Sequence, residues 1–143
     1  MAASTPEQDI VEIEQLLARY AVGMTKDDIE SVMAVFTPDG TYSAFGDTYS
    51  LGDFPTLVAA APKGLFMVGT PAVELDGDEG TGEQPLCFVD QTTHHMRIGW
   101  YTDTYRRTEH GWRLRTRRMT FLRKSGSRDS GRPHDPSRPT PAS

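Results

Sequence analysis

The sequence predicts an α+β domain in which one curved, mainly antiparallel sheet wraps over N-terminal helices. Over the first 36 residues, apolar side chains recur at the spacings of three and four that are typical of amphipathic helices. After Gly40 the chain changes to β-branched and aromatic runs separated by turn residues. With 143 residues and Cys87 as its single cysteine, the chain is expected to form one domain held by packing rather than by disulfides.

Two amphipathic helices account for the N-terminal segment. Ser4 and Thr5 offer capping side chains and Pro6 suits a first helical turn, so the first helix is predicted to begin at residue 6. Its apolar stripe consists of Ile10, Ile13, Leu17, Tyr20 and Met24. A second, shorter helix follows a cap at Asp27 or Asp28 and carries the stripe Ile29, Val32, Met33 and Phe36. We expect these two stripes to pack on a common core.

Five runs of strand type follow the helices. They cover residues 41–45, 65–75, 84–91, 94–108 and 112–124, with a loop at 46–53 and a short helix at 55–61. The turn Asp76-Gly77-Asp78 predicts a hairpin between the second and third runs. Residues 125–143 contain no large apolar side chain, so we predict a disordered tail. The domain is therefore expected at residues 6–124, with residues 1–5 disordered as well.

Charge is divided unevenly along the chain. Residues 1–90 carry 16 acids and 3 bases, whereas residues 91–143 carry 4 acids and 12 bases. The bases alternate with apolar strand residues and no nucleic-acid-binding motif accompanies them, so we expect no nucleic-acid partner. We expect the basic strands instead to face acidic elements of the same domain or of a second copy in a homodimer. Without a signal peptide or a membrane-spanning run, the prediction is a cytoplasmic protein with no membrane partner.

The stretch from His94 to Arg123 holds the strongest candidates for chemistry. Tyr101 and Asp103 are two residues apart in a predicted strand, so their side chains share one face of the sheet. If that face lines a pocket, a carboxyl group among aromatic walls can act as a general acid or base. The sequence leaves open a second interpretation, in which Asp103 forms a structural bridge to Arg117 or Arg118 on the adjacent strand.

Histidine and arginine pairs add further candidates. His94 and His95 could supply a second proton-transfer group, because an imidazole titrates near neutral pH. Consecutive strand residues point to opposite faces, so at most one of them reaches the pocket, and His94 is the candidate taken here. One arginine of the pair 117–118 could likewise hold a carboxylate or phenolate at the pocket mouth, and Arg118 is the candidate taken.

Large apolar side chains complete the predicted pocket. Those expected to contact substrate are Met24, Phe36, Met67, Phe88 and Met119. They predict a hydrophobic ligand, with polycyclic and terpenoid compounds included. No metal-ligand spacing, phosphate-binding loop or nucleophile elbow is present in the sequence, so no metal and no cofactor are expected.

Six short motifs occur in the order typical of one family. They are residues 20–21, Asp28, residues 35–40, residues 75–78, residues 99–103, and Arg107 with residues 111–114. Through them, about residues 10–120 resemble the SnoaL-like branch of the nuclear transport factor 2-like superfamily, which includes scytalone dehydratase and ketosteroid isomerase. The resemblance implies a cone-shaped α+β barrel, also described as a cystatin-like roll, with a pocket between the helices and the sheet.

The resemblance also implies a catalytic set, which this chain matches in part. Dehydratase-like relatives carry a tyrosine and an aspartate near the end of the first helix, and a histidine at the start of the strand after the short helix. Tyr20 matches the tyrosine. The aspartate position is occupied by Thr25, and the histidine positions by Leu65 and Phe66.

Two functions follow from this resemblance. The first is a cofactor-independent enzyme that performs a dehydration, isomerisation or cyclisation by proton transfer on a hydrophobic substrate. Asp103 would then move the proton, aided by His94 or His95, while Tyr20 and Tyr101 stabilise an oxyanion. In that case Asp103→Asn would abolish turnover and leave the melting temperature within a few degrees. The alternative is a noncatalytic protein that binds a hydrophobic ligand after losing the usual Asp and His.

Overall fold

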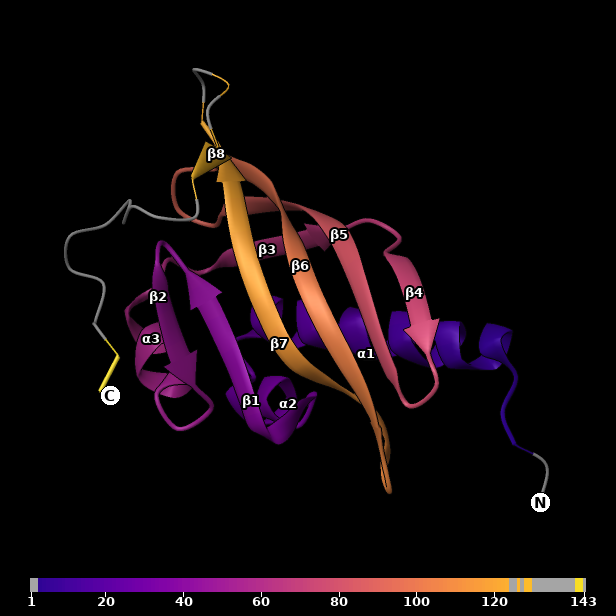
Figure 1. Cartoon of the computed structure of the whole chain (residues 1–143). Coiled ribbons are helices and arrows are strands. Elements are labelled where there is room, and N and C mark those ends of the chain that lie inside the picture. The colour runs from indigo at the N-terminus through magenta and orange to yellow at the C-terminus, as the bar shows by residue number, and fades with distance from the viewer. Residues whose placement is uncertain (1–2, 124–125, 127, 130–140, 143) are drawn as a thin grey trace.

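Three helices and an eight-stranded sheet form the domain, which confirms the predicted α+β fold (Figure 1). The structure is a computed structural model that describes residues 3–123, 126, 128–129 and 141–142. The elements are α1 (Pro6–Lys26), α2 (Ile29–Met33), β1 (Phe36–Ala44), β2 (Asp47–Ser50), α3 (Phe54–Ala60), β3 (Gly64–Val68), β4 (Ala72–Asp76), β5 (Glu79–Asp90), β6 (Met96–Thr108), β7 (Gly111–Leu122) and β8 (Arg128–Asp129). All three helices lie on one face of the sheet, with α1 crossing behind the long strands (Figure 1).

Helix α1 begins where the capping residues predict. The Thr5 side chain accepts a hydrogen bond from the backbone N–H of Gln8, and the Gln8 side chain accepts one from the backbone N–H of Thr5. The helix buries the face that carries Ile13, Leu17 and Tyr20, as its apolar spacing requires. None of the helices within the described residues combines the length and apolarity needed to cross a bilayer.

The sheet has the strand order β2-β1-β7-β6-β5-β3, with β4 also paired to β5 and β8 paired to β7. Every pairing is antiparallel except that of β1 with β7. A bulge in β7 opposes Thr104 to Thr116 but Tyr105 to Leu114, which leaves Arg115 as an extra residue. The bulge changes the parity of the strand, so Leu114 and Arg117, three residues apart, both face the helices.

Three element predictions need correction. Phe36, expected in the stripe of the second helix, is the first residue of β1, because α2 already ends at Met33. The predicted strand 65–75 is two strands, β3 and β4, because Gly69 and Pro71 interrupt it and the N–H of Gly69 bonds to the carbonyl of Pro85. The predicted loop 46–53 contains strand β2, which pairs with β1. Its turn has positive φ at Phe45 (55°) and Gly46 (84°), and a phenylalanine gives no sequence signal for that conformation.

The predicted flexible ends lie partly outside the described residues. At the N-terminus, the Ser4 hydroxyl donates to Asp9 at 2.6 Å and accepts a hydrogen bond from Arg107 at 2.9 Å. Asp9 accepts two hydrogen bonds from Arg107 and one from the indole of the buried Trp112. This polar cluster joins the start of α1 to the far end of the sheet. In the tail, β8 adds two residues to β7, pairing Arg128 with Leu122.

Candidate functional site

An apolar pocket opens between the helices and the inner face of the sheet. Its volume is about 110 Å³. On the scale where an engineered cavity of roughly 150 Å³ binds benzene, this is room for about one aromatic ring. The lining residues come from α1, β1, α3, β3, β5, β6, β7 and the turns after β1 and α3. They are Tyr20, Met24, Tyr42, Ala44, Phe45, Phe54, Leu57, Val58, Ala60, Ala61, Pro62, Phe66, Leu86, Phe88, Arg97, Tyr101, Met119 and Phe121.

Two buried phenols form the polar end of this pocket. The rings of Tyr20 on α1 and Tyr101 on β6 meet edge to face, with centroids 5.8 Å apart, and each residue is 1% exposed. Burial raises the pKa of Tyr20 well above its ordinary value of 10. Burial likewise raises the pKa of Tyr101. Both side chains are therefore neutral at physiological pH and cannot act as bases. Their hydroxyls bond to each other, so one O–H of the pair is left to donate elsewhere.

A buried ion pair lies behind the two phenols. Arg117 donates from Nε to Oδ1 of Asp103 at 2.8 Å and from Nη2 to Oδ2 at 2.9 Å, and neither side chain is exposed. Nη2 also donates to Oε1 of Gln84 at 2.9 Å. The guanidinium carbon lies 3.6 Å from the ring centroid of Tyr101 and 4.5 Å from that of Tyr20. The cation therefore stacks on the same rings that close the pocket.

Of the two roles predicted for Asp103, a pocket acid or base and a structural bridge to an arginine, the structure shows the bridge. It points to the inner face, as its spacing from Tyr101 predicts, but it forms the cross-strand bridge to Arg117, its direct partner in the β6–β7 register. The Tyr105 hydroxyl donates to Oδ2 of Asp103 at 3.3 Å. Asp103 is not among the residues that line the pocket. A ligand in the pocket meets the phenols, and the carboxylate stands behind them.

Five of the predicted site residues do line the pocket, namely Tyr20, Met24, Phe88, Tyr101 and Met119. Four others lie elsewhere. Phe36 is buried in the core against Tyr20 and Phe54. Met67 and Arg118 are exposed on the outer face of the sheet.

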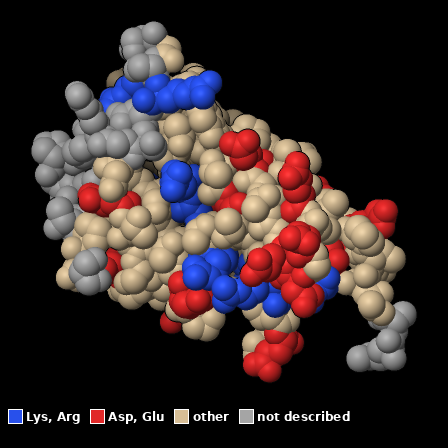
Figure 2. Space-filling model, in the orientation of Figure 1, with Lys and Arg blue, Asp and Glu red and all other residues tan. Residues whose placement is uncertain are grey.

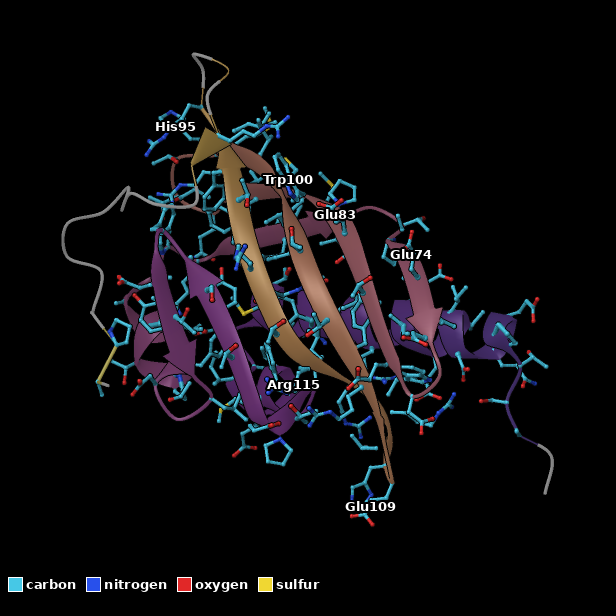
Figure 3. All side chains as sticks on the ribbon, viewed as in Figure 1. Glu74, Glu83, His95, Trp100, Glu109 and Arg115 are labelled. Carbon is cyan, nitrogen blue, oxygen red and sulfur yellow. The ribbon has the colours of Figure 1, made fainter. Side chains whose placement is uncertain are left out.

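His94 is also placed away from the pocket. It is exposed in the turn between β5 and β6, with a φ of 59°. His95, its neighbour, lies at the same end of the sheet, opposite the end that carries Glu109 (Figure 3). Neither imidazole lines the pocket. The sequence spacing could not show this, because the strand that both histidines were expected to enter begins only at Met96.

Two pocket residues that were not predicted, Phe66 and Arg97, have a simple signal in the sequence. Phe66 has the parity opposite to Met67, and Gly64, Phe66 and Val68 face inward along β3. Arg97 has the parity of Tyr101 along β6, so the alternation that identifies Tyr101 also identifies Arg97. Other missed residues, such as Ala60, Ala61 and Pro62, lie at the end of α3 and could not be assigned to a cavity without the tertiary structure.

The two positions that depart from the dehydratase pattern lie next to each other. The Thr25 hydroxyl donates to the carbonyl of Ala21 at 2.8 Å and accepts a hydrogen bond from the backbone N–H of Phe66 at 3.0 Å. Thr25 thus fastens the end of α1 to β3. Phe66 points into the pocket, whereas Leu65 is exposed on the outer face. Of the two histidine positions, only 66 faces the ligand space.

The chemical capacity of the site follows from its ionisable groups. Among the described residues that line the pocket, these groups are three tyrosines and Arg97. None of these lining residues is an Asp, Glu, His, Cys or Lys. The lining therefore offers apolar contact, hydrogen-bond donors and one cation, and it offers no side chain that accepts protons near neutral pH.

Helices and a curved sheet thus enclose an apolar pocket whose inner end is closed by a buried tyrosine pair. The match of residues 7–118 to the SnoaL-like domain model shows that the chain belongs to the SnoaL-like family. Rv2910c of Mycobacterium tuberculosis, an uncharacterized protein, is 29% identical over 125 residues, covering 74% of this chain and 80% of that protein.

Solved structures agree with this fold. Rv3472 of Mycobacterium tuberculosis, a protein of unknown function solved as a variant, superposes with a TM-score of 0.75 at 24% identity, over 82% of this chain and 78% of that one. A Novosphingobium aromaticivorans protein named "Putative Scytalone Dehydratase" superposes with a TM-score of 0.73 at 13% identity, over 90% of this chain and 95% of that one. Identities this low show the common fold alone.

Proposed function

We propose that this protein binds a small hydrophobic molecule in the pocket between α1, α3 and the sheet, without carrying out proton-transfer catalysis on it. The observation that carries the proposal is the composition of the lining, which is apolar apart from phenols and Arg97. A general base must lie within hydrogen-bond reach of the proton that it removes. The carboxylate predicted for that task is instead bonded to Arg117 and Tyr105.

The volume and lining also indicate the ligand size. A cavity of about 110 Å³ takes roughly one ring, and larger ligands must extend through its opening. Burial of a single ring is favourable, because each Å² of apolar surface removed from water contributes roughly 25 cal/mol of free energy. The pair Tyr20 and Tyr101 adds a neutral donor, so a ligand with one oxygen acceptor fits better than a pure hydrocarbon.

Acetophenone tests this proposal, because it has one ring, one carbonyl oxygen and exchangeable hydrogens next to the carbonyl. Titration of ¹⁵N-labelled protein is expected to shift backbone signals of Ala60 and Ala61. Ala61→Phe, which fills the pocket from the end of α3, should abolish the shifts, whereas Ala59→Phe on the exposed side of the same helix should not. Equal binding to the wild type and to Ala61→Phe would contradict the proposal.

A proton-transfer enzyme is the second candidate, favoured by the name of the Novosphingobium neighbour and by the phenol pair, which suits an oxyanion. The same probe separates the two candidates. In D₂O, an enzyme of this class would exchange the hydrogens next to the acetophenone carbonyl faster than buffer does. We expect the rate with protein to equal the rate in buffer, and a rate that falls in Tyr20→Phe would restore the enzymatic candidate.

We also propose that a second copy of the chain covers the outer face of the sheet. Exposed apolar side chains lie on three strands of this face, with β5 between the first and the second: Leu65 and Met67 on β3, Met96 and Ile98 on β6 and Leu122 on β7. Acidic side chains gather over β4 and β5 and basic ones over β7 (Figure 2). In an isologous dimer the acidic patch of each copy can face the basic patch of the other, so the same charge pairing occurs at two places. This supports a homodimer over another partner.

A further inference from the structure

We infer that the pocket selects ligands that carry an anionic oxygen group, and that Arg97 is the residue that binds this group. The inference rests on the proposed ligand-binding function and adds the charge of the ligand to it. Arg97 lies on the inner face of β6, directly opposite Phe88 of β5, and both side chains line the pocket. It is the one charged side chain among the described residues of the lining.

The position of Arg97 places its charge at the pocket rim. The residue is half-buried, whereas Tyr101, four residues further along the same strand, is fully buried. At about 3.3 Å per residue, the two backbone positions are roughly 13 Å apart. The apolar space between them therefore has a cation at its rim and neutral phenols at its inner end.

The Arg97 guanidinium has no ion pair and no hydrogen bond to any described residue. The acid close enough to be influenced by it, Asp90, lies beyond ion-pair distance. The Oδ1 atom of Asp90 instead accepts backbone hydrogen bonds from Thr92 at 2.8 Å and Thr93 at 3.1 Å. These backbone bonds lower the pKa of Asp90 more than the charge of Arg97 does. A ligand would thus not have to displace a protein carboxylate to reach the guanidinium.

Arginine suits a carboxylate better than any other side chain at this position. Its planar guanidinium presents two parallel N–H donors to the two oxygens, and it stays charged at every physiological pH. The other arginines near the pocket do not offer this. Arg117 already uses Nε and Nη2 on Asp103 and Gln84, and Arg118 is on the opposite face of the sheet. The predicted role of an arginine at the pocket mouth therefore passes from Arg118 to Arg97.

Benzoate and benzamide provide the test, because they have nearly the same shape and differ in charge. Dissociation constants are measured by ¹⁵N NMR titration for the wild type, for Arg97→Met, which keeps the apolar stem, and for the control Arg118→Met. We expect the wild type and Arg118→Met to prefer benzoate, and Arg97→Met to bind benzoate about tenfold or more weakly with unchanged benzamide affinity.

Three results would overturn the inference. Benzoate affinity that survives Arg97→Met would show that another group binds the anion. Equal losses for benzoate and benzamide would show that Arg97 only packs against the ring. Both of these results leave the ligand-binding function intact, because benzamide still binds the wild type. If neither compound, nor acetophenone, shifts the pocket signals of the wild type, the proposed function itself fails and the inference fails with it.

Discussion

Asp103→Asn is expected to unfold this protein far more readily, because it removes the carboxylate from a fully buried ion pair. Arg117 would keep its charge, exchange its two charge-assisted bonds of 2.8 and 2.9 Å for at most one bond to the neutral amide oxygen, and keep its bond to Gln84. Removing one partner of a buried pair costs about 3–5 kcal/mol. For a domain of this length, that corresponds to a fall of roughly 10–15 °C in melting temperature.

This expectation reverses the one that the sequence alone supports, in which the same variant loses turnover but keeps its melting temperature. Urea unfolding followed by circular dichroism measures the free energy of unfolding directly. Asp78→Asn is the matched control, since Asp78 pairs with Arg107 but its side chain is 78% exposed, and such pairs contribute little. A melting temperature for Asp103→Asn that matches this control would refute the structural role.

A double variant separates the charge from the packing. Asp103→Leu with Arg117→Met replaces the pair with apolar side chains, an exchange that is often neutral in proteins. We expect the double variant to recover at least half of the stability lost in Asp103→Asn. Recovery is incomplete because Oε1 of the buried Gln84 loses the donor that Arg117 supplies, and an unsatisfied buried acceptor costs about 1–3 kcal/mol.

Two further predictions concern the ends of the molecule and its outer face. Hydrogen bonds from Arg107 lower the pKa of Asp9 to about 2, so this carboxylate stabilises the fold by about 1–2 kcal/mol above pH 4 and loses that contribution as the pH falls toward 2. Asp9→Asn should lose it at pH 6 and flatten the acid side of a urea-unfolding profile; an unchanged profile would contradict the assignment. For the homodimer, light scattering at micromolar concentration should give twice the chain mass for the wild type and one chain mass for Met67→Lys with Ile98→Lys, while Val11→Lys on α1 stays dimeric. A monomeric wild type would show the dimer proposal to be wrong.

The fold was predictable because its signals are local. The helical period of α1, the cap at Thr5 and the hairpin turn at Gly77 all act within a few residues. Alternation along β6 also assigned Tyr101 and Asp103 correctly to the inner face. What these signals cannot supply is the parity of a strand after an irregularity. The bulge at Arg115 decides that Arg117 rather than Arg118 faces inward, and nothing in the residue types around it marks the extra residue.

The site was harder to predict, because an inward position has two meanings. An inward carboxylate can line a cavity, or it can form an ion pair with another buried residue in the core. Both arrangements are compatible with the same alternation of residues along the strand. Here Arg117 lies directly across from Asp103 in the register, and a buried acid beside a buried base forms the pair. The sequence is compatible with both outcomes, since the difference between them depends on which side chains from β5 and α1 close the space around the pair.

The side chains that close this space also compensate the buried charge of Arg117. Nη1 of Arg117 is buried without a hydrogen-bond partner among the described residues, a loss that is costly on its own. The rings of Tyr101 and Tyr20 lie over the same guanidinium at 3.6 and 4.5 Å, and each cation–π contact returns about 0.5–2 kcal/mol. This compensation requires both rings to stay in place. The ion pair therefore holds the two phenols at the inner end of the pocket, and under the proposed function this would orient the tyrosine pair before a ligand binds.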